Sequence, residues 1–321
     1  MRVGQNPAKY VKEVAQPARV TVAVLNYIPF ISGFYAEMMD VLKACLNSIR
    51  ENTDQPFDLL VFDNASCEEV RQYLLDEHQA GRIQMLMLSE KNLGKGGAWN
   101  AILGGAPGEI ITYTDNDCLF YKGWLPRSLE LLETFPNVGM VTARPFRTNE
   151  AFYTSTQKWG ETTADVTIEQ GHFIPFEVFR EFDLSLAQSE EEIKAHYERT
   201  QDVRLSYKNV SAIAGASHWQ FTTRKDVISQ YLPFSMDRPM GQVKQLDQRM
   251  NEAGYLRLMP TEPLVMNMSN TLRNIPGLVS KSENVRKVAQ SHPLLDFPPV
   301  KKGLLGLYDS IFRWYYDRQT D

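Results

Sequence analysis

The sequence of 321 residues lacks several features that define common protein classes. Its three cysteines, Cys45, Cys67 and Cys118, have no CxxC spacing, and its five histidines form no cluster with metal-ligand spacing. We therefore predict neither a zinc site nor a disulfide framework. The net charge is -5, and a dedicated nucleic-acid binder usually carries a basic excess. We predict no nucleic-acid partner.

Long hydrophobic runs are also absent from the sequence. The apolar stretches are far shorter than the roughly 20 residues that a membrane helix needs. The N-terminus has no charged start followed by an apolar core, so no signal peptide is visible. We expect a cytoplasmic protein, and peripheral contact with the inner face of a membrane stays open.

The composition is that of an ordinary globular protein, with 43% hydrophobic and 23% charged residues. After a polar arm at 1–18, short apolar runs alternate with helical stripes. Strands are predicted over 20–25, 57–62, 83–88 and 109–114, and helices over 38–50, 68–80 and from about Ala98. This alternation predicts an α/β fold with a mostly parallel central sheet and helices on both faces.

Polar residues follow three of the predicted strands. Asp63 ends the second strand, Asn92 follows the third, and Asp115-Asn116-Asp117 ends the fourth. Ligands of such sheets bind beyond the carboxyl ends of the strands, so we expect these residues to share one crevice.

The triplet offers two carboxylates separated by one residue. Asp115 and Asp117 repel each other unless a cation or a donor lies beside them. A divalent ion that bridges a diphosphate meets that need and stabilises a leaving phosphate. The alternative is a solvated turn after a strand, where Asp and Asn are common.

The other two loops also allow two interpretations. The carboxylate of Asp63 can accept a hydrogen bond from the N–H of a nucleobase, or it can cap the helix that begins near Glu68, a role that Ser66 could also take. In the run from Asn92 to Gly97, Gly94 allows a ligand to approach the backbone and Lys95 is suited to meet a phosphate. The spacing is not that of a P-loop or of GxGxxG.

The second half of the chain holds the candidates for proton transfer and acceptor binding. Asp247, on a predicted helix, can act as a general base, or it can be an exposed acid paired with a nearby Arg or Lys. His218 can bind a sugar hydroxyl and Trp219 can stack on a sugar ring, but simple packing is the alternative for both.

Together these segments resemble the family 2 glycosyltransferases, which have the GT-A fold. The first strand, 22–27, the strand end 61–66, the Asn92-Leu93-Gly94 turn and the triplet resemble four motifs of that family in the same order. The resemblance continues more weakly to about residue 270 through 215–217 and 249–255. It implies a GT-A domain over 19–270, with a nucleotide-sugar-binding half at 19–145 and an acceptor-binding half at 146–270, followed by a C-terminal helical extension at 271–321.

The resemblance also implies an activity and roles for these residues. It implies an inverting glycosyltransferase that uses a UDP-, dTDP- or GDP-sugar, Mn²⁺ or Mg²⁺, and a glycan, a lipid-linked molecule or another hydroxyl as acceptor. The expected roles are nucleotide-sugar binding by Asn26, Asp63, Asn92, Gly94, Lys95, Asp115 and Asn116, acceptor binding by His218 and Trp219, metal binding by Asp117 and catalysis by Asp247.

Two positions depart from the family pattern. The usual Glu-Asp pair is not intact, and Gln245 and Asp247 stand near its place. Asn267 stands where a histidine often completes the metal site. An amide oxygen is a weak ligand, so we expect the metal to be bound loosely.

Two other functions and one further surface stay open. A nucleotidyltransferase needs a glycine-rich loop after the first strand, where this chain has 26–30 without glycine. A decayed transferase scaffold that binds a glycan or a partner protein is the non-catalytic alternative. The aromatic stripe at 301–318, with basic residues nearby, fits contact with a membrane surface, or packing against the main domain or a second subunit of a homodimer.

Overall fold

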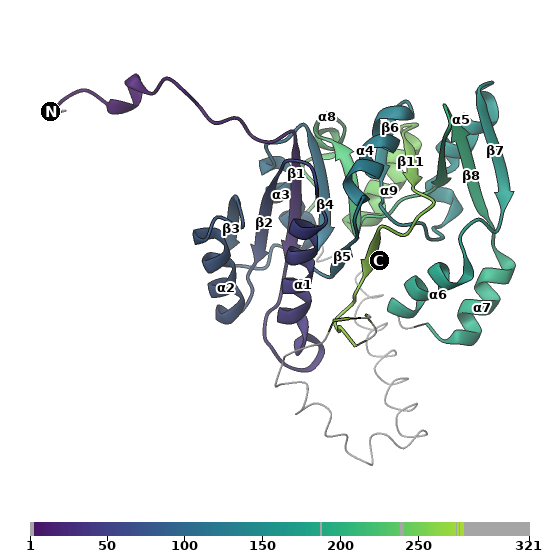
Figure 1. The fold of residues 1–321 in the computed structure, drawn as a ribbon, viewed down its shortest axis with the longest axis horizontal. Coiled ribbons are helices and arrows are strands. Elements are labelled where there is room, and N and C mark those ends of the chain that lie inside the picture. The colour runs from purple at the N-terminus through teal and green to yellow at the C-terminus, as the bar shows by residue number, and fades with distance from the viewer. Residues whose placement is uncertain (1–2, 187, 238–240, 274, 276, 279–321) are drawn as a thin grey trace, which may run out of the picture.

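The computed structural model describes residues 3–278 except 187, 238–240, 274 and 276 (Figure 1). Residues 3–17 are almost entirely exposed and lead into the sheet, with one 3-10 helix, η1 (Pro7–Tyr10). Most of the predicted extension at 271–321, including the stripe at 301–318, lies outside the described residues. Within the described part, no helix is both long and apolar enough to cross a membrane.

The described residues form a ten-stranded sheet in the order β3-β2-β1-β4-β10-β6-β11-β9-β8-β7. Its strands are β1 (Val20–Asn26), β2 (Phe57–Asn64), β3 (Met85–Ser89), β4 (Ile110–Asp115), β6 (Val138–Val141), β7 (Val166–Gly171), β8 (Asp202–Tyr207), β9 (Val210–Ala214), β10 (Gln220–Arg224) and β11 (Leu256–Met259). The pairings make β7, β9 and β10 run against the other strands. The predicted α/β class with a mostly parallel sheet is therefore confirmed.

The four predicted strands of the N-terminal half are all present and parallel. β1 lies between β2 and β4, with Val22 opposite Leu59 on one side and Thr112 on the other. Every residue of β1 is buried, as expected for a strand covered on both faces.

Nine α-helices and three further 3-10 helices complete the described part. They are α1 (Met38–Glu51), α2 (Glu68–Gln79), α3 (Gly94–Gly105), α4 (Trp124–Thr134), α5 (Thr154–Thr162), α6 (Phe176–Ser185), α7 (Glu190–Arg199), α8 (Lys225–Ile228), α9 (Gln242–Glu252), η2 (Gly33–Tyr35), η3 (Glu150–Phe152) and η4 (Ser229–Tyr231). The apolar stripe predicted along α1 is buried throughout.

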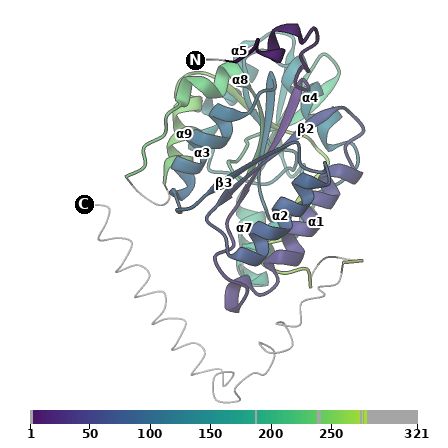
Figure 2. The ribbon, with the colours of Figure 1, turned by 90° about the vertical axis from the view of Figure 1, so that its left-hand side faces the viewer.

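Helices cover both faces of the sheet (Figure 2). One face packs against α1, α2 and α4 in a core that includes Val22 and Val24. The other face packs against α3, α8 and α9 in a second core that includes Ala23 and Leu25. The alternation of side chains along β1 sends neighbouring residues into different cores.

One predicted boundary was wrong. We predicted a helix from about Ala98, but α3 begins at Gly94, so the glycine-rich turn forms its first turn. Gly97 allows this close packing, because a Cβ there would lie 2.8 Å from both Leu93 Cβ and Met236 Cε. Gly94 has a φ of 65°, a conformation that favours glycine.

A small second sheet joins distant parts of the chain. β5 (Cys118–Phe120) pairs antiparallel with β12 (Val265–Asn267), which places Asn267 opposite Cys118. The amide of Met268 donates to the Asp117 carbonyl at 2.7 Å. The end of the triplet is therefore held by a segment about 150 residues further along the chain.

Candidate active site

The predicted site residues lie at the carboxyl ends of three neighbouring strands. Asn26, the last residue of β1, lies opposite Asp63 in β2, and Leu25 lies opposite Asp115 in β4. Because β10 runs antiparallel to β4, its first residue, Gln220, also lies at this edge. The segment 215–219 before β10 therefore lies at the same edge of the sheet.

A chain of buried polar side chains connects the strand ends. Asn116 donates to Asn26 Oδ1 at 2.6 Å, and Asn26 donates to Asp63 Oδ1 at 2.8 Å and to Ser66 Oγ at 3.0 Å. Asn26 and Asp63 are fully buried. Such a fully satisfied network fixes the positions of its members.

The helix-cap alternative for Asp63 and Ser66 is wrong. The residue before the first turn of α2 is Cys67, and no side chain caps this helix. Ser66 instead accepts from the amide of Ile28 at 2.9 Å, and its own amide donates to Asp63 Oδ2 at 3.1 Å. These contacts fix the loop after β2 against the end of β1.

A second pair of amides holds the turn before α3. Asn64 donates to Asn92 Oδ1 at 3.0 Å, and Asn64 Oδ1 accepts from the amide of Leu93 at 2.8 Å. Asn92 Oδ1 also accepts from the amide of Gly94 at 2.8 Å. In this structure Asn92 therefore shapes the turn.

Lys95 faces the triplet. Its Nζ lies 2.8 Å from Asp115 Oδ2 and also lies over the rings of Trp99 and Tyr113. The Tyr113 hydroxyl donates to the other Asp115 oxygen. The first carboxylate of the triplet is thus paired within the protein.

Asp117 has a different environment. Burial, followed by the nearby Asp115 carboxylate, raises the pKa of Asp117 to about 7, and Lys95 opposes this rise. The Cys118 thiol donates to Asp117 Oδ1 at 3.9 Å. A cation beside Asp117 would relieve the repulsion that raises this pKa.

Asp117 and Asn267 lie where β5 and β12 pair, and they offer a carboxylate and an amide oxygen. Asn267 is the last residue of β12, opposite Cys118 in β5, and its Oδ1 accepts from the amide of Ser269 at 2.7 Å. Carboxylate and amide oxygens suit Mg²⁺ or Mn²⁺. No group of three or more His, Cys, Asp or Glu side chains with metal-binding geometry occurs among the described residues.

Asp247 is not the exposed acid of the alternative interpretation. It is 4% exposed and forms an ion pair with Arg257, which is fully buried. Its second oxygen, Oδ2, lies 3.0 Å from His218 Nδ1. Burial lowers the pKa of Arg257, and Asp247 opposes this. The predicted base is therefore part of an Arg257–Asp247–His218 cluster.

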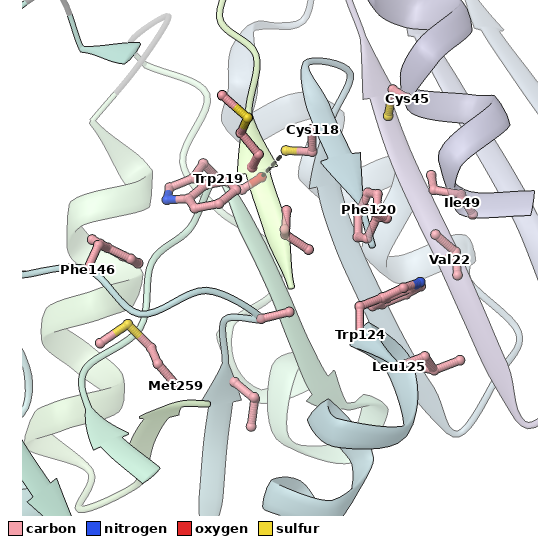
Figure 3. Close-up of a cluster of buried hydrophobic side chains, with 14 of the residues drawn as sticks. Val22, Cys45, Ile49, Cys118, Phe120, Trp124, Leu125, Phe146, Trp219 and Met259 are labelled. Atoms are coloured by element: carbon pink, nitrogen blue, oxygen red, sulfur yellow. Dashed lines mark hydrogen bonds between the residues drawn. The ribbon is translucent and has the colours of Figure 1, made fainter. Parts of the chain in front are cut away.

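The Trp219 ring packs into the interior rather than along the crevice. It is 8% exposed and stacks on Phe182 at 5.7 Å between ring centroids, with Phe146 at 6.1 Å. The backbone of Trp219 lies at the site, because its carbonyl accepts from the Asp115 amide at 2.9 Å. The Cys118 thiol points toward the same carbonyl (Figure 3).

Two residues of this site were not predicted from the sequence. Arg257 lies in the apolar run 256–259, where a charged residue signals a buried partner. Tyr113 lies two positions before Asp115 in an extended strand, a spacing that places both on one face. Both signals were present in the sequence.

Comparison with known proteins finds one similar sequence and several similar structures. An uncharacterized glycosyltransferase of Nostoc sp. is 24% identical over 136 residues, which are 41% of this chain and 42% of that protein. A Pyrobaculum calidifontis mannosyltransferase, solved with GDP-Man and Mn²⁺, is 18% identical with a TM-score of 0.46. The S. aureus protein TarS, solved as residues 1–349, is 12% identical with a TM-score of 0.45.

The solved structures are longer than the matched part. Each match covers 77% of this chain, with 55% of the mannosyltransferase and 59% of TarS. The chain thus spans less than two thirds of the length of these proteins.

The α/β sheet with polar side chains at its strand ends has the general architecture of open α/β sheets, whose ligands bind beyond the carboxyl ends of the strands. Residues 31–186 match the family model described as glycosyl transferase family 2. We assign this part of the chain to that family, which confirms the resemblance stated above.

Proposed function

We propose that the chain is an inverting glycosyltransferase. It moves a sugar from a UDP-, dTDP- or GDP-sugar to a hydroxyl of a glycan, a lipid-linked molecule or another acceptor. The observation that carries this proposal is the convergence of Asn26, Asp63 and Asp115 at neighbouring strand ends in a chain with a family 2 segment. Such a crevice can hold a base, a ribose and a diphosphate side by side.

The nucleotide side of the crevice is built by the N-terminal half. Asn26, Asn116 and Asp63 are proposed to position the base and ribose, and Asn92 and Gly94 shape the adjoining turn. Because Asp63 is fully buried, direct contact with a base requires a local rearrangement at the end of β2. Asp63→Asn is expected to change the preference among UDP, dTDP and GDP in calorimetry.

The diphosphate and its metal are proposed to bind beside the Asp115-Asn116-Asp117 triplet. Asp117 and Asn267 are proposed to hold Mn²⁺ or Mg²⁺, while Lys95 and Asp115 lie beside the phosphates. When bound, the ion supplies Lewis-acid stabilisation of the leaving diphosphate. The weak amide ligand at Asn267 supports loose binding in the absence of donor.

The acceptor side of the crevice is proposed to lie in the C-terminal half. A cavity of about 870 Å³ lies between α6 and the segment after β12, and Asn267 and Met268 form part of its wall. Its lining combines carboxylates and Arg180 with apolar side chains such as Leu184 and Met266. An acceptor with polar and apolar parts fits this lining, and His218 is proposed to contact the acceptor from the edge of the sheet.

The proposed activity is tested by donor binding and sugar transfer. Thermal shift with UDP, dTDP and GDP, with and without Mn²⁺, is expected to single out one nucleotide. Release of that nucleotide from its sugar conjugates is then compared between wild type and Asp117→Ala, with the exposed Asp54→Ala as control. Equal activity with and without Mn²⁺, in wild type and Asp117→Ala alike, would exclude the metal role.

The competing function is a decayed scaffold that binds a glycan or a partner. The ion-paired Asp247 and the altered Glu-Asp pair favour this alternative. Calorimetry separates the two, since glycan binding without binding of any nucleotide supports the scaffold.

A membrane-bound acceptor is proposed to bring the segment 301–318 to a lipid surface, from the cytoplasmic side. Flotation with anionic vesicles is expected to be lost on truncation after residue 300. If flotation is unchanged, light scattering of both forms tests the alternative, in which this segment contributes to a homodimer.

A further inference from the structure

The environment of Asp247 prevents its carboxylate from meeting an acceptor directly. One oxygen is engaged by Arg257 and the other by His218, and the side chain is only 6% exposed. A general base must lie within hydrogen-bond reach of the proton that it removes. Asp247 meets this condition only through His218.

His218 provides the connection between this buried pair and the surface. Its side chain is 32% exposed, and Nδ1 lies 3.0 Å from Asp247 Oδ2. An ionised carboxylate only accepts hydrogen bonds, so Nδ1 must carry the proton of the neutral ring. Nε2 then holds the lone pair that can accept a proton.

The backbone places His218 beside the proposed reaction centre. The next residue, Trp219, accepts the Asp115 amide at its carbonyl. The preceding residue is fixed by Thr142, whose Oγ1 accepts from the Ser217 amide at 2.8 Å. Gly215, with a φ of 127°, provides the turn that brings this segment to the carboxyl end of β4.

We propose that His218 is the general base of the transferase and that Asp247 is a positioning residue, an inference that rests on the function proposed above. The acceptor hydroxyl oxygen bonds to the anomeric carbon while the bond from that carbon to the phosphate oxygen breaks. The diphosphate leaves with the electron pair, and the hydroxyl proton moves to Nε2. The imidazolium is stabilised by Asp247 and later releases its proton to solvent.

Arg257 has a distinct part in this arrangement. It balances the charge of Asp247 in a buried ion pair. Asp247 and, through it, Arg257 are the charged groups that contact His218 among the described residues. Proton transfer to His218 therefore adds one positive charge beside a carboxylate that is already fixed.

The first test needs no donor. Nitrogen-15 NMR of the histidine rings at pH 8, with His218→Gln to assign the signal, is expected to show the tautomer protonated at Nδ1. Asp247→Asn is expected to change this tautomer, because its amide can donate to the ring. A wild-type ring protonated at Nε2 would overturn the proposal.

The second test separates catalysis from folding and from donor binding. His218→Gln is expected to lower kcat about 100-fold or more while the Kd for UDP or GDP with Mn²⁺ stays within about twofold. The exposed His78→Gln, on α2, is the matched control.

The outcomes distinguish this inference from the proposed function. If wild type binds no nucleotide and releases none from any sugar conjugate, the transferase function fails. If wild type transfers sugar and His218→Gln retains kcat within about threefold, the base assignment fails while the transferase function stands. If His218→Gln loses nucleotide binding and kcat together, the residue is structural and the base assignment also fails.

Discussion

Lys95 Nζ lies 2.8 Å from Asp115 Oδ2 and joins the first turn of α3 to the end of β4. This ion pair is partly exposed, with 15% of the Lys95 side chain and 27% of the Asp115 side chain accessible. Among the described residues Asp117, in contrast, forms no ion pair, although Lys95 is close enough to oppose the rise of its pKa. Asp115 and Asp117 therefore have different electrostatic environments.

Removing the charge of Lys95 is expected to strengthen metal binding and weaken nucleotide binding. In Lys95→Met, Mn²⁺ should bind about fivefold more tightly at pH 8 without nucleotide, equivalent to about 1 kcal/mol for a partly exposed charge. Calorimetry measures both ligands, and the exposed Lys91→Met serves as control. Weaker Mn²⁺ binding in Lys95→Met would contradict this account of the ion pair.

Metal affinity should depend on pH through Asp117. Its pKa is raised to about 7, and a metal binds the ionised carboxylate, so protons compete with Mn²⁺ below this value. We expect the affinity to fall about tenfold per pH unit between pH 6.5 and 5 and to level off above about pH 7.5. A constant affinity from pH 5 to 8, measured by titration calorimetry, would show that Asp117 is not a ligand.

The identity of residue 267 should set the metal preference. Asn267→His is expected to raise the ratio of Mn²⁺ to Mg²⁺ affinity severalfold, because an imidazole nitrogen is a softer donor than an amide oxygen. Asn267→Ala should weaken binding of both ions. An unchanged ratio in the histidine variant would place residue 267 outside the metal's ligands.

The buried polar chain should contribute to stability as well as to binding. Asn26 is fully buried and bonds to Asp63, Ser66 and Asn116, so Asn26→Ala leaves three partners with lost hydrogen bonds. We expect urea unfolding to show a loss of about 2–4 kcal/mol. The exposed Asn47→Ala, on α1, should change stability by less than about 0.5 kcal/mol. A loss below about 1 kcal/mol for Asn26→Ala would mean that water replaces these bonds.

The N-terminal half could be predicted because its local signals agree. Short β-branched runs such as 20–25 are buried on both faces. The apolar residues of α1 keep helical spacing along the whole helix. Parallel strands then bring Asn26, Asp63 and Asp115 to one edge without any knowledge of side-chain contacts.

The details of side-chain pairing could not be predicted in this way. Asp247 and Arg257 come from a helix and a strand, and only the packing of α9 against the sheet brings them together. The start of α3 was misplaced because glycines usually weaken a helix, whereas Gly97 here packs closely against Leu93 Cβ. Tertiary contacts determined both features.

The pairing of β5 with β12 has a consequence for synthesis of the protein. Asp117 leaves the ribosome about 150 residues before Asn267, and its carbonyl finds its partner only in the amide of Met268. A nascent chain can therefore form β1 to β4 before β12, which holds the end of the triplet, has been synthesised. If the proposed metal site is correct, the transferase activity requires that the strand at Val265–Asn267 has been translated and has docked.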